Sequence, residues 1–174
     1  MAIDYNNIMT EFVRVASEGV GSQLSTKGSP PHPSVIRART GEPQPDYPYV
    51  QLDVLSTTKT SGWLLDEGVT DTDEVFRDTH YKILLQYTVY GGNANSIAHE
   101  LEAYFRSDRV LGEVEDNTSG TVEQTFEVIS SPEGLATENL EVAAFNLTFN
   151  IISSACMCSL YKNSLQGRNM QSTS

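Results

Sequence analysis

The chain has 174 residues and a formal net charge of −12, because 23 Asp and Glu residues outnumber 11 Lys and Arg residues. This length suits one domain, and a hydrophobic fraction of 39% is enough for a lean core. The acidic balance excludes a protein that grips nucleic acid through a basic face, and it argues against binding to an anionic membrane. The sequence shows neither a secretory signal nor an apolar run long enough to span a membrane.

The first part of the chain predicts one helix followed by extended segments. Apolar residues recur at helical spacing over residues 4–19, and Asp4 is a suitable N-cap. Alternation of apolar and polar residues then predicts short strands over 35–39 and 49–55, with a proline-rich stretch between them.

The middle of the chain combines an acidic segment with the strongest strand pattern. Residues 57–79 are polar and acidic, and they predict a long extended hairpin outside the main core, with its turn near 66–68. Residues 80–90 alternate regularly and predict a strand. Helical spacing predicts a second helix from about residue 93 to 107, followed by a loop and a strand over 121–129.

The last part of the chain predicts a long strand over residues 140–153 and a C-terminal arm over 155–174 that is rich in Ser, Asn and Gln. The order of elements favours an α+β fold in which two helices pack on one face of a mixed, mostly antiparallel sheet, with the long hairpin attached. Residues 1–154 are expected to form the single domain.

Patterns for catalysis, metal binding or a cofactor are missing from the sequence. None of His32, His80 and His99 has a second ligand at metal spacing, and Cys156 and Cys158 are best interpreted as ordinary reduced thiols. Phosphate-loop, nucleophile-elbow and calcium-loop patterns are incomplete. We therefore expect no enzyme, no metal and no cofactor, while a catalytic site assembled from distant residues stays open.

The acidic residues gather in two stretches. Eight acids and no Lys or Arg lie between Arg109 and Lys162, and a second cluster lies in the predicted hairpin. One interpretation is a solvated surface that keeps the protein soluble. The other is a wall that repels phosphate and lets DNA slide past. On that second interpretation the residues expected to face a channel are Asp66, Glu67, Asp71, Asp73, Glu123 and Glu127.

Two arginines and two tyrosines surround the proline-rich stretch. Arg37 and Arg39 alternate on one face of the predicted short strand, and Tyr47 and Tyr49 follow between prolines. Two guanidiniums on one face can pair with carboxylates of a neighbouring copy. The alternative interpretation is that the two arginines lie on an exposed strand face in solvent. These four residues are therefore candidates for a subunit interface.

Four motifs follow one another along the chain. They are the leading helix of residues 3–19, an arginine strand that runs into a proline-tyrosine motif over 35–50, an aromatic strand over 81–91 that ends Val-Tyr-Gly, and a helix that ends in residues 101–106. This order resembles the tail-terminator and neck (head-completion) proteins of tailed bacteriophages. The resemblance covers residues 3–153.

The resemblance implies a structural virion protein that forms a homohexameric ring, with a dodecamer as the alternative. Such a ring caps the tail tube and joins it to the head connector, so the implied partners are further copies, the connector, the tail tube and the sheath protein. DNA passes through without specific binding, and no membrane is involved. The implied location is the virion neck, with assembly in the host cytoplasm. Two alternatives stay open: a tail-tube or other virion subunit that polymerises, and an enzyme or small-ligand module with a scattered site.

Overall fold

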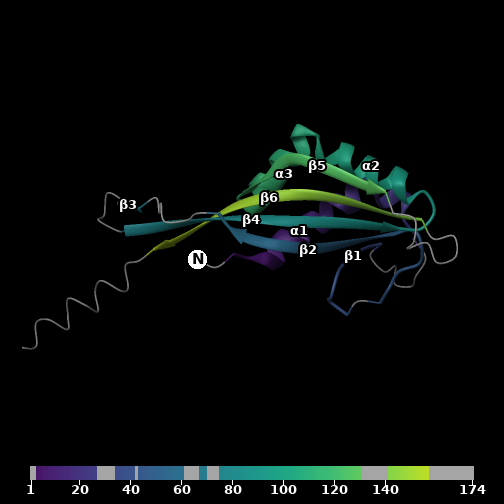
Figure 1. Ribbon diagram of the computed structural model, residues 1–174, viewed down its shortest axis with the longest axis horizontal. Helices are drawn as coiled ribbons and strands as arrows, with labels where there is room; N and C mark the ends of the chain where they lie inside the picture. Colours follow the sequence, from purple (N-terminus) through teal and green to yellow (C-terminus); the bar gives the residue numbers. More distant parts are fainter. Residues whose placement is uncertain are drawn as a thin grey trace, which may run out of the picture.

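The computed structural model describes residues 3–26, 34–41, 43–60, 67–69, 75–130 and 141–156. These residues build a twisted β-sheet with helices packed on one of its faces (Figure 1). The helices are α1 (Tyr5–Val20), α2 (Ala94–Phe105) and α3 (Asp108–Thr118), with a short 3-10 turn after α1 at Gly21–Gln23. The predicted α+β architecture is therefore confirmed.

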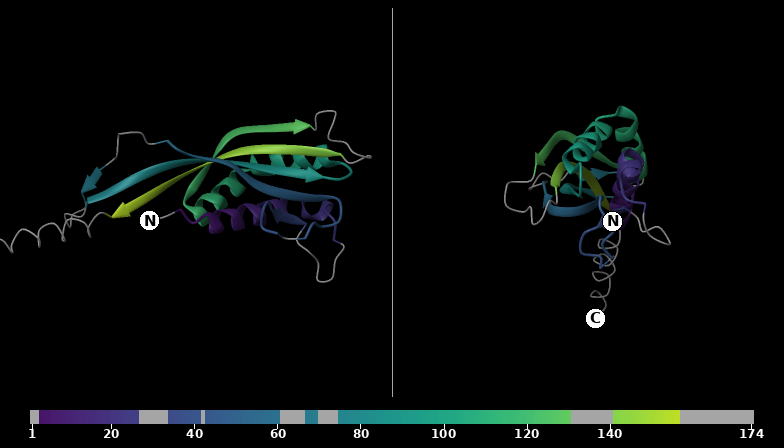
Figure 2. Two further views of the ribbon diagram at one scale, coloured as in Figure 1. Left: turned by 60° about the horizontal axis from the view of Figure 1, so that its bottom comes forward. Right: turned by 90° about the vertical axis from the view of Figure 1, so that its right-hand side faces the viewer.

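The described strands form one six-stranded sheet with the order β1-β2-β4-β6-β5, and β3 pairs with β4 beyond the end of β2. The strands are β1 (Val35–Arg37), β2 (Tyr49–Lys59), β3 (Glu67–Val69), β4 (Val75–Tyr90), β5 (Gly120–Ser130) and β6 (Val142–Cys156). Only β1 and β2 pair in parallel, so the sheet is mixed and mostly antiparallel, as predicted. The two long central strands, β4 and β6, run past the helices and project with β3 at one end (Figures 1 and 2).

The core lies between the helices and the facing side of the sheet. In α1, the predicted stripe of Ile8, Phe12, Val15 and Ala16 is buried, and Asp4 caps the helix by accepting a hydrogen bond from the Asn7 backbone N–H at 3.0 Å. Strand alternation supplies the other half of the core, because every second residue from Ile83 to Val89 in β4 and from Ala143 to Phe149 in β6 is buried beneath the helices.

A polar link fixes α1 against α3. The buried carboxylate of Glu11 accepts hydrogen bonds from Arg14 at 2.6 Å and from the Asn117 side chain at 2.9 Å. The hydrogen bond from Arg14 is the main reason why the pKa of Glu11 is lowered. Asn7 adds a second bridge, since its side-chain amide donates to the Asn117 carbonyl at 3.0 Å.

The prediction of only two helices is wrong, because α3 occupies the segment after α2 for which a loop was expected. Two residues separate it from the end of α2, and its buried positions Val110, Val114 and Thr118 recur at i, i+4 and i+8. Four acids and Gly112 make its sequence polar overall, which conceals this narrow stripe. Packing against α1 and β5, rather than helix propensity, therefore decides that this segment is helical.

The acidic segment also differs from the prediction. Residues 67–69 form β3, paired with Val75–Arg77 of β4, so the turn expected near 66–68 is wrong where the structure describes it. Strand β4 begins at Val75 rather than His80 because β3 and β6 pair with its first residues. The predicted strand over 35–39 ends at Arg37, and Arg39 lies in a turn with φ 63°.

Candidate functional site

No helix of the described residues covers the sheet face opposite α1, α2 and α3 (Figure 2). The strand register places Asp53, Gln86 and Asn146 in one row across β2, β4 and β6. Within this row the Gln86 side-chain amide donates to the Asn146 side-chain oxygen at 2.9 Å. This open face therefore offers amide and hydroxyl groups to whatever lies against it.

Two ion pairs lie on the open face. Arg39 lies 3.2 Å from Asp53, and the Lys82 ammonium lies 2.8 Å from the Glu123 carboxylate. The hydrogen bond from Lys82 lowers the pKa of Glu123, which keeps this carboxylate ionised. Asp53 and Glu123 on the open face therefore each have a basic partner.

The negative charge of the described residues lies instead on the helix layer. The three helices contain eight acids and two arginines, which gives a net charge of −6. The acids are Glu11, Glu18, Glu100, Glu102, Asp108, Glu113, Glu115 and Asp116, and the arginines are Arg14 and Arg109. The two layers of the domain therefore present surfaces of different electrostatic character.

Three tyrosines stack at the end of the sheet remote from β3. The ring centroids of Tyr47 and Tyr49 lie 5.6 Å apart, and those of Tyr49 and Tyr90 lie 4.9 Å apart. Tyr49 is buried in the middle, whereas Tyr47 is 49% exposed. Burial is the main cause that raises the pKa of Tyr49 to about 12. The stack presents one half-exposed aromatic ring on a rigid base, which suits a contact surface.

Gly91 lies directly against the proline between these tyrosines. Its φ of +115° is a conformation that side-chain-bearing residues rarely adopt, and a Cβ at this position would lie 2.9 Å from the Pro48 Cα. The proline-tyrosine motif and the Val-Tyr-Gly motif, distant in the sequence, therefore meet in one corner of the fold.

Glu141 closes the same corner from the start of β6. Its carboxylate accepts hydrogen bonds from the backbone N–H groups of Asn93 and Asn95, both at 3.0 Å, at the beginning of α2. Its carbonyl accepts a further hydrogen bond from the Gly91 N–H at 2.9 Å. A carboxylate in this place accepts hydrogen bonds from backbone N–H groups that have no partner within the helix. Its negative charge is also stabilised by the positive end of the helix dipole.

Replacing Gly91 with alanine is expected to lower the free energy of unfolding by about 1–3 kcal/mol, because the new methyl group meets backbone atoms in a strained conformation. Gly92→Ala is the matched control, since a Cβ at Gly92 meets nothing within 4 Å. Urea unfolding of both variants measures the difference. Equal effects of the two substitutions would contradict the close packing of Gly91 on Pro48.

In the part of the chain that the structure describes, no three His, Cys, Asp or Glu residues come together to hold a metal ion. His99 lies 3.6 Å from Glu102 on the exposed side of α2. Among the described helices, none has the length and apolar character needed to cross a membrane.

The comparison with known proteins decides the family. The family model described as phage neck terminator protein matches residues 7–162, which is most of the chain. The chain belongs to the phage neck terminator family. This confirms the resemblance drawn from the sequence motifs and makes the protein a structural component of the phage neck. No curated protein matches the chain.

In this neck terminator, both arginines predicted for a subunit interface have partners within their own chain. Arg37 donates to the Asn6 side-chain oxygen at 2.7 Å and to the Thr10 hydroxyl at 2.5 Å. Arg39 pairs with Asp53. The two arginines do not share a strand face, because the strand ends before Arg39. A role of either one between copies stays a prediction.

The two predicted tyrosines, by contrast, come together with a residue of the aromatic strand. Tyr47 and Tyr49 form the stack with Tyr90 that is described above. Tyr90, Gly91 and Glu141 were not predicted to lie in the corner where the proline-tyrosine motif meets the Val-Tyr-Gly motif. The Val-Tyr-Gly ending was the local signal for the first two, but the Glu141 contact is long-range and has no local signal.

The structure describes only some of the acids predicted for a channel wall in the terminator. Glu123 is paired with Lys82. Glu67 and Glu127 lie in β3 and β5 at positions opposite Arg77 and Asn146 in the strand register. The remaining acids, Asp66, Asp71 and Asp73, lie outside the described residues. The channel wall itself stays a prediction.

Proposed function

We propose that copies of this chain form a closed ring in the phage neck, which caps the tail tube and joins the tail to the head connector. The expected ring is a hexamer, with a dodecamer as the alternative, and DNA passes through its centre. The tail tube, the sheath protein and the connector are the proposed partners. The family supports the location, and the sheet edges support the ring.

The observation that carries the proposal is a pair of open sheet edges. Strand β1 pairs with β2 only at Val50–Leu52, so residues 54–59 of β2 have β4 as their one strand partner among the described residues. On the other side of the sheet, β5 pairs only with β6 in the described part of the chain. Each edge exposes backbone groups that another strand can satisfy.

The two edges also lie at the same level of the sheet. The register places Lys59, Tyr81, Ile151 and Gly120 in one row across β2, β4, β6 and β5. Strand β5 runs antiparallel to β2, because β2 is antiparallel to β4, β4 to β6 and β6 to β5. Contact between two different edges is head-to-tail, and such contacts close into a ring when the rotation between copies permits it.

The electrostatics of the described residues fit a channel for DNA. On the open face Arg39 and Lys82 are paired with Asp53 and Glu123, and the helix layer is net negative. Neither surface neutralises phosphates, so neither gains the counterion-release term that holds proteins on DNA. We therefore propose that DNA passes the ring without being bound. The hairpin acids named from the sequence, such as Asp71 and Asp73, remain candidates for the channel wall.

Native mass spectrometry and light scattering of the purified protein test the ring. Thr58 and Thr121 make a matched pair for this test, because they are exposed, lie in one row and belong to opposite edges. The double variant Thr58→Lys, Thr121→Lys is expected to weaken the ring by at least about tenfold, since like charges then meet between copies. Thr58→Lys with Thr121→Glu is expected to restore it.

The proposal is supported if the wild type forms a closed ring of defined mass, the double-lysine variant loses it and the Lys–Glu variant regains it. Monomer alone at micromolar concentration contradicts it. An open polymer favours the alternative of a tail-tube subunit. Circular dichroism of each variant checks that the fold is retained.

A further inference from the structure

Strand β6 is longer than its neighbour β5. The first residue of β5, Gly120, pairs with Ile151, so β5 does not reach residues 152–156 of β6. On the opposite side of this projecting end, β3 pairs with β4 where β2 has stopped. In the described part of the chain no strand takes the corresponding place beside β6 (Figure 1).

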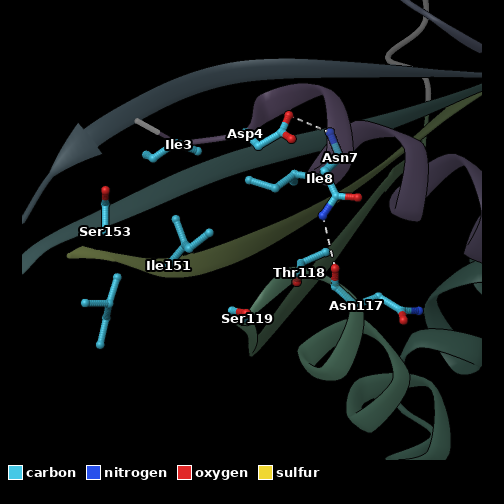
Figure 3. Close-up of a pocket in the computed structure, with 10 residues that line it drawn as sticks. Ile3, Asp4, Asn7, Ile8, Asn117, Thr118, Ser119, Ile151 and Ser153 are labelled. Atoms are coloured by element: carbon cyan, nitrogen blue, oxygen red, sulfur yellow. Dashed lines mark hydrogen bonds between the residues drawn. The ribbon is translucent and has the colours of Figure 1, made fainter. Parts of the chain in front are cut away.

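Two hollows meet at this end of β6. The first, of about 390 Å³, lies between the start of α1, the end of α3 and β6, and Figure 3 shows Ile3, Ile8 and Ile151 around it. The second, of about 360 Å³, lies at the start of β5 and is lined by His80 and Asn150 of the sheet and by Glu115 of α3. Ser119, Ile151 and Ile152 line both hollows. The two hollows therefore flank the place that a continuation of β5 beyond Gly120 would occupy.

Apolar side chains at this end of β6 are left partly exposed. Ile152 is 51% exposed, the largest exposure among the large hydrophobic side chains that the structure describes as exposed. Ile151 is half-buried, and Ile3 packs only partly against the core. An extended segment beside residues 152–156 would cover these side chains. Because strand residues alternate between faces, such a segment would direct successive side chains into one hollow and then the other.

We propose that residues 157–162 of a second copy add to β6 in this place as an extra strand. The proposal rests on the assembly proposed above, since it names a contact between copies. Main-chain hydrogen bonds to β6 would supply affinity, and the two hollows would select the alternate side chains.

Three observations favour this occupant. The segment follows directly on the projecting end of β6, and the family match continues through it to residue 162. Its sequence, Met-Cys-Ser-Leu-Tyr-Lys, supplies apolar side chains on both strand faces. It contains no Gly, Asn or Asp, the residues that two-residue hairpin turns favour, so an immediate return onto its own β6 is disfavoured.

Cross-linking of the full-length chain tests the contact. In a background of Cys156→Ser and Cys158→Ser, the chain carries Ile152→Cys and Leu160→Cys and is treated with a short bis-maleimide. The control carries Ser96→Cys on the exposed side of α2 with the same Leu160→Cys. A contact between copies raises the local thiol concentration, so covalent multimers are expected about tenfold faster than in the control. Light scattering on the same samples reports the ring.

The outcomes separate this inference from the proposed ring. A ladder of covalent multimers with the Ile152 pair supports the strand exchange. A ring that yields only cross-links within one chain, or no faster reaction than the control, overturns the exchange and leaves the ring intact. A protein that stays monomeric and gives no multimers overturns both.

Discussion

Replacing Phe12 with alanine is expected to lower the free energy of unfolding by about 3–5 kcal/mol, the usual cost of removing a buried aromatic ring. The Phe12 ring is fully buried and contacts Phe105 at 5.9 Å and Phe149 at 5.2 Å between centroids. It joins α1 to α2 and to β6, so the substitution opens a cavity where helices and sheet meet. Urea or thermal unfolding measures the loss.

Tyr5→Ala is the matched control for this experiment, because Tyr5 begins the same helix and is 40% exposed. Its effect is expected to stay within about 0.5 kcal/mol, as for most surface substitutions. A domain has a total stability of only about 5–15 kcal/mol, so Phe12→Ala is also expected to reduce the yield of assembled protein. A similar, small effect of both variants would contradict the central position of Phe12.

Stability is expected to fall as the pH rises from about 10 toward 12, because Tyr49, Tyr87 and Tyr90 resist ionisation in the folded chain. Burial raises the pKa of Tyr87 well above its ordinary value, and burial with the neighbouring tyrosines raises the pKa of Tyr49 to about 12. A raised pKa in the fold means that the stabilisation is complete below the unfolded value and is lost above it. For Tyr49 the loss is on the order of 2 kcal/mol by pH 12.

Tyr49→Phe separates this contribution, since it keeps the stacked ring and removes the ionising hydroxyl. The fall in unfolding free energy between pH 9 and pH 12, measured by urea unfolding, is expected to be smaller in the variant than in the wild type. Tyr87→Phe removes the second contribution but also the hydrogen bond from the Tyr87 hydroxyl to the Phe12 carbonyl at 2.8 Å. An unchanged pH dependence in both variants would contradict the burial of these hydroxyls.

The long periodic elements could be predicted from the sequence because their periodicity reflects burial directly. The residues expected inward in α1 and β4, such as Phe12 and Tyr87, are fully buried. Helix α3 could not be predicted, since its polar sequence becomes helical through contact with α1 and β5. The strand role of residues 67–69 was missed for the same reason, because only pairing with β4 makes them extended.

The candidate site was predictable only where a local motif marked it. Tyr47 and Tyr49 stood out between prolines, and the structure brings them together. Their meeting with Tyr90 depends on the register of β2 against β4, which periodicity alone does not fix. The same holds for Arg37, whose hydrogen bonds to Asn6 and Thr10 depend on where α1 lies relative to β1.

The packing of Phe12 on Phe149 also governs when the chain can fold during its synthesis. Helix α1 leaves the ribosome first, but its apolar stripe packs against the later elements α2 and α3, and Phe12 also contacts Phe149 of β6, near the other end of the domain. A core closed by contacts so distant in sequence forms late, after the long loops between them are ordered. Strand β6 must therefore be synthesised before the sheet and its two edges are complete, so the assembly proposed above would begin with fully synthesised domains rather than with chains whose β6 is still missing.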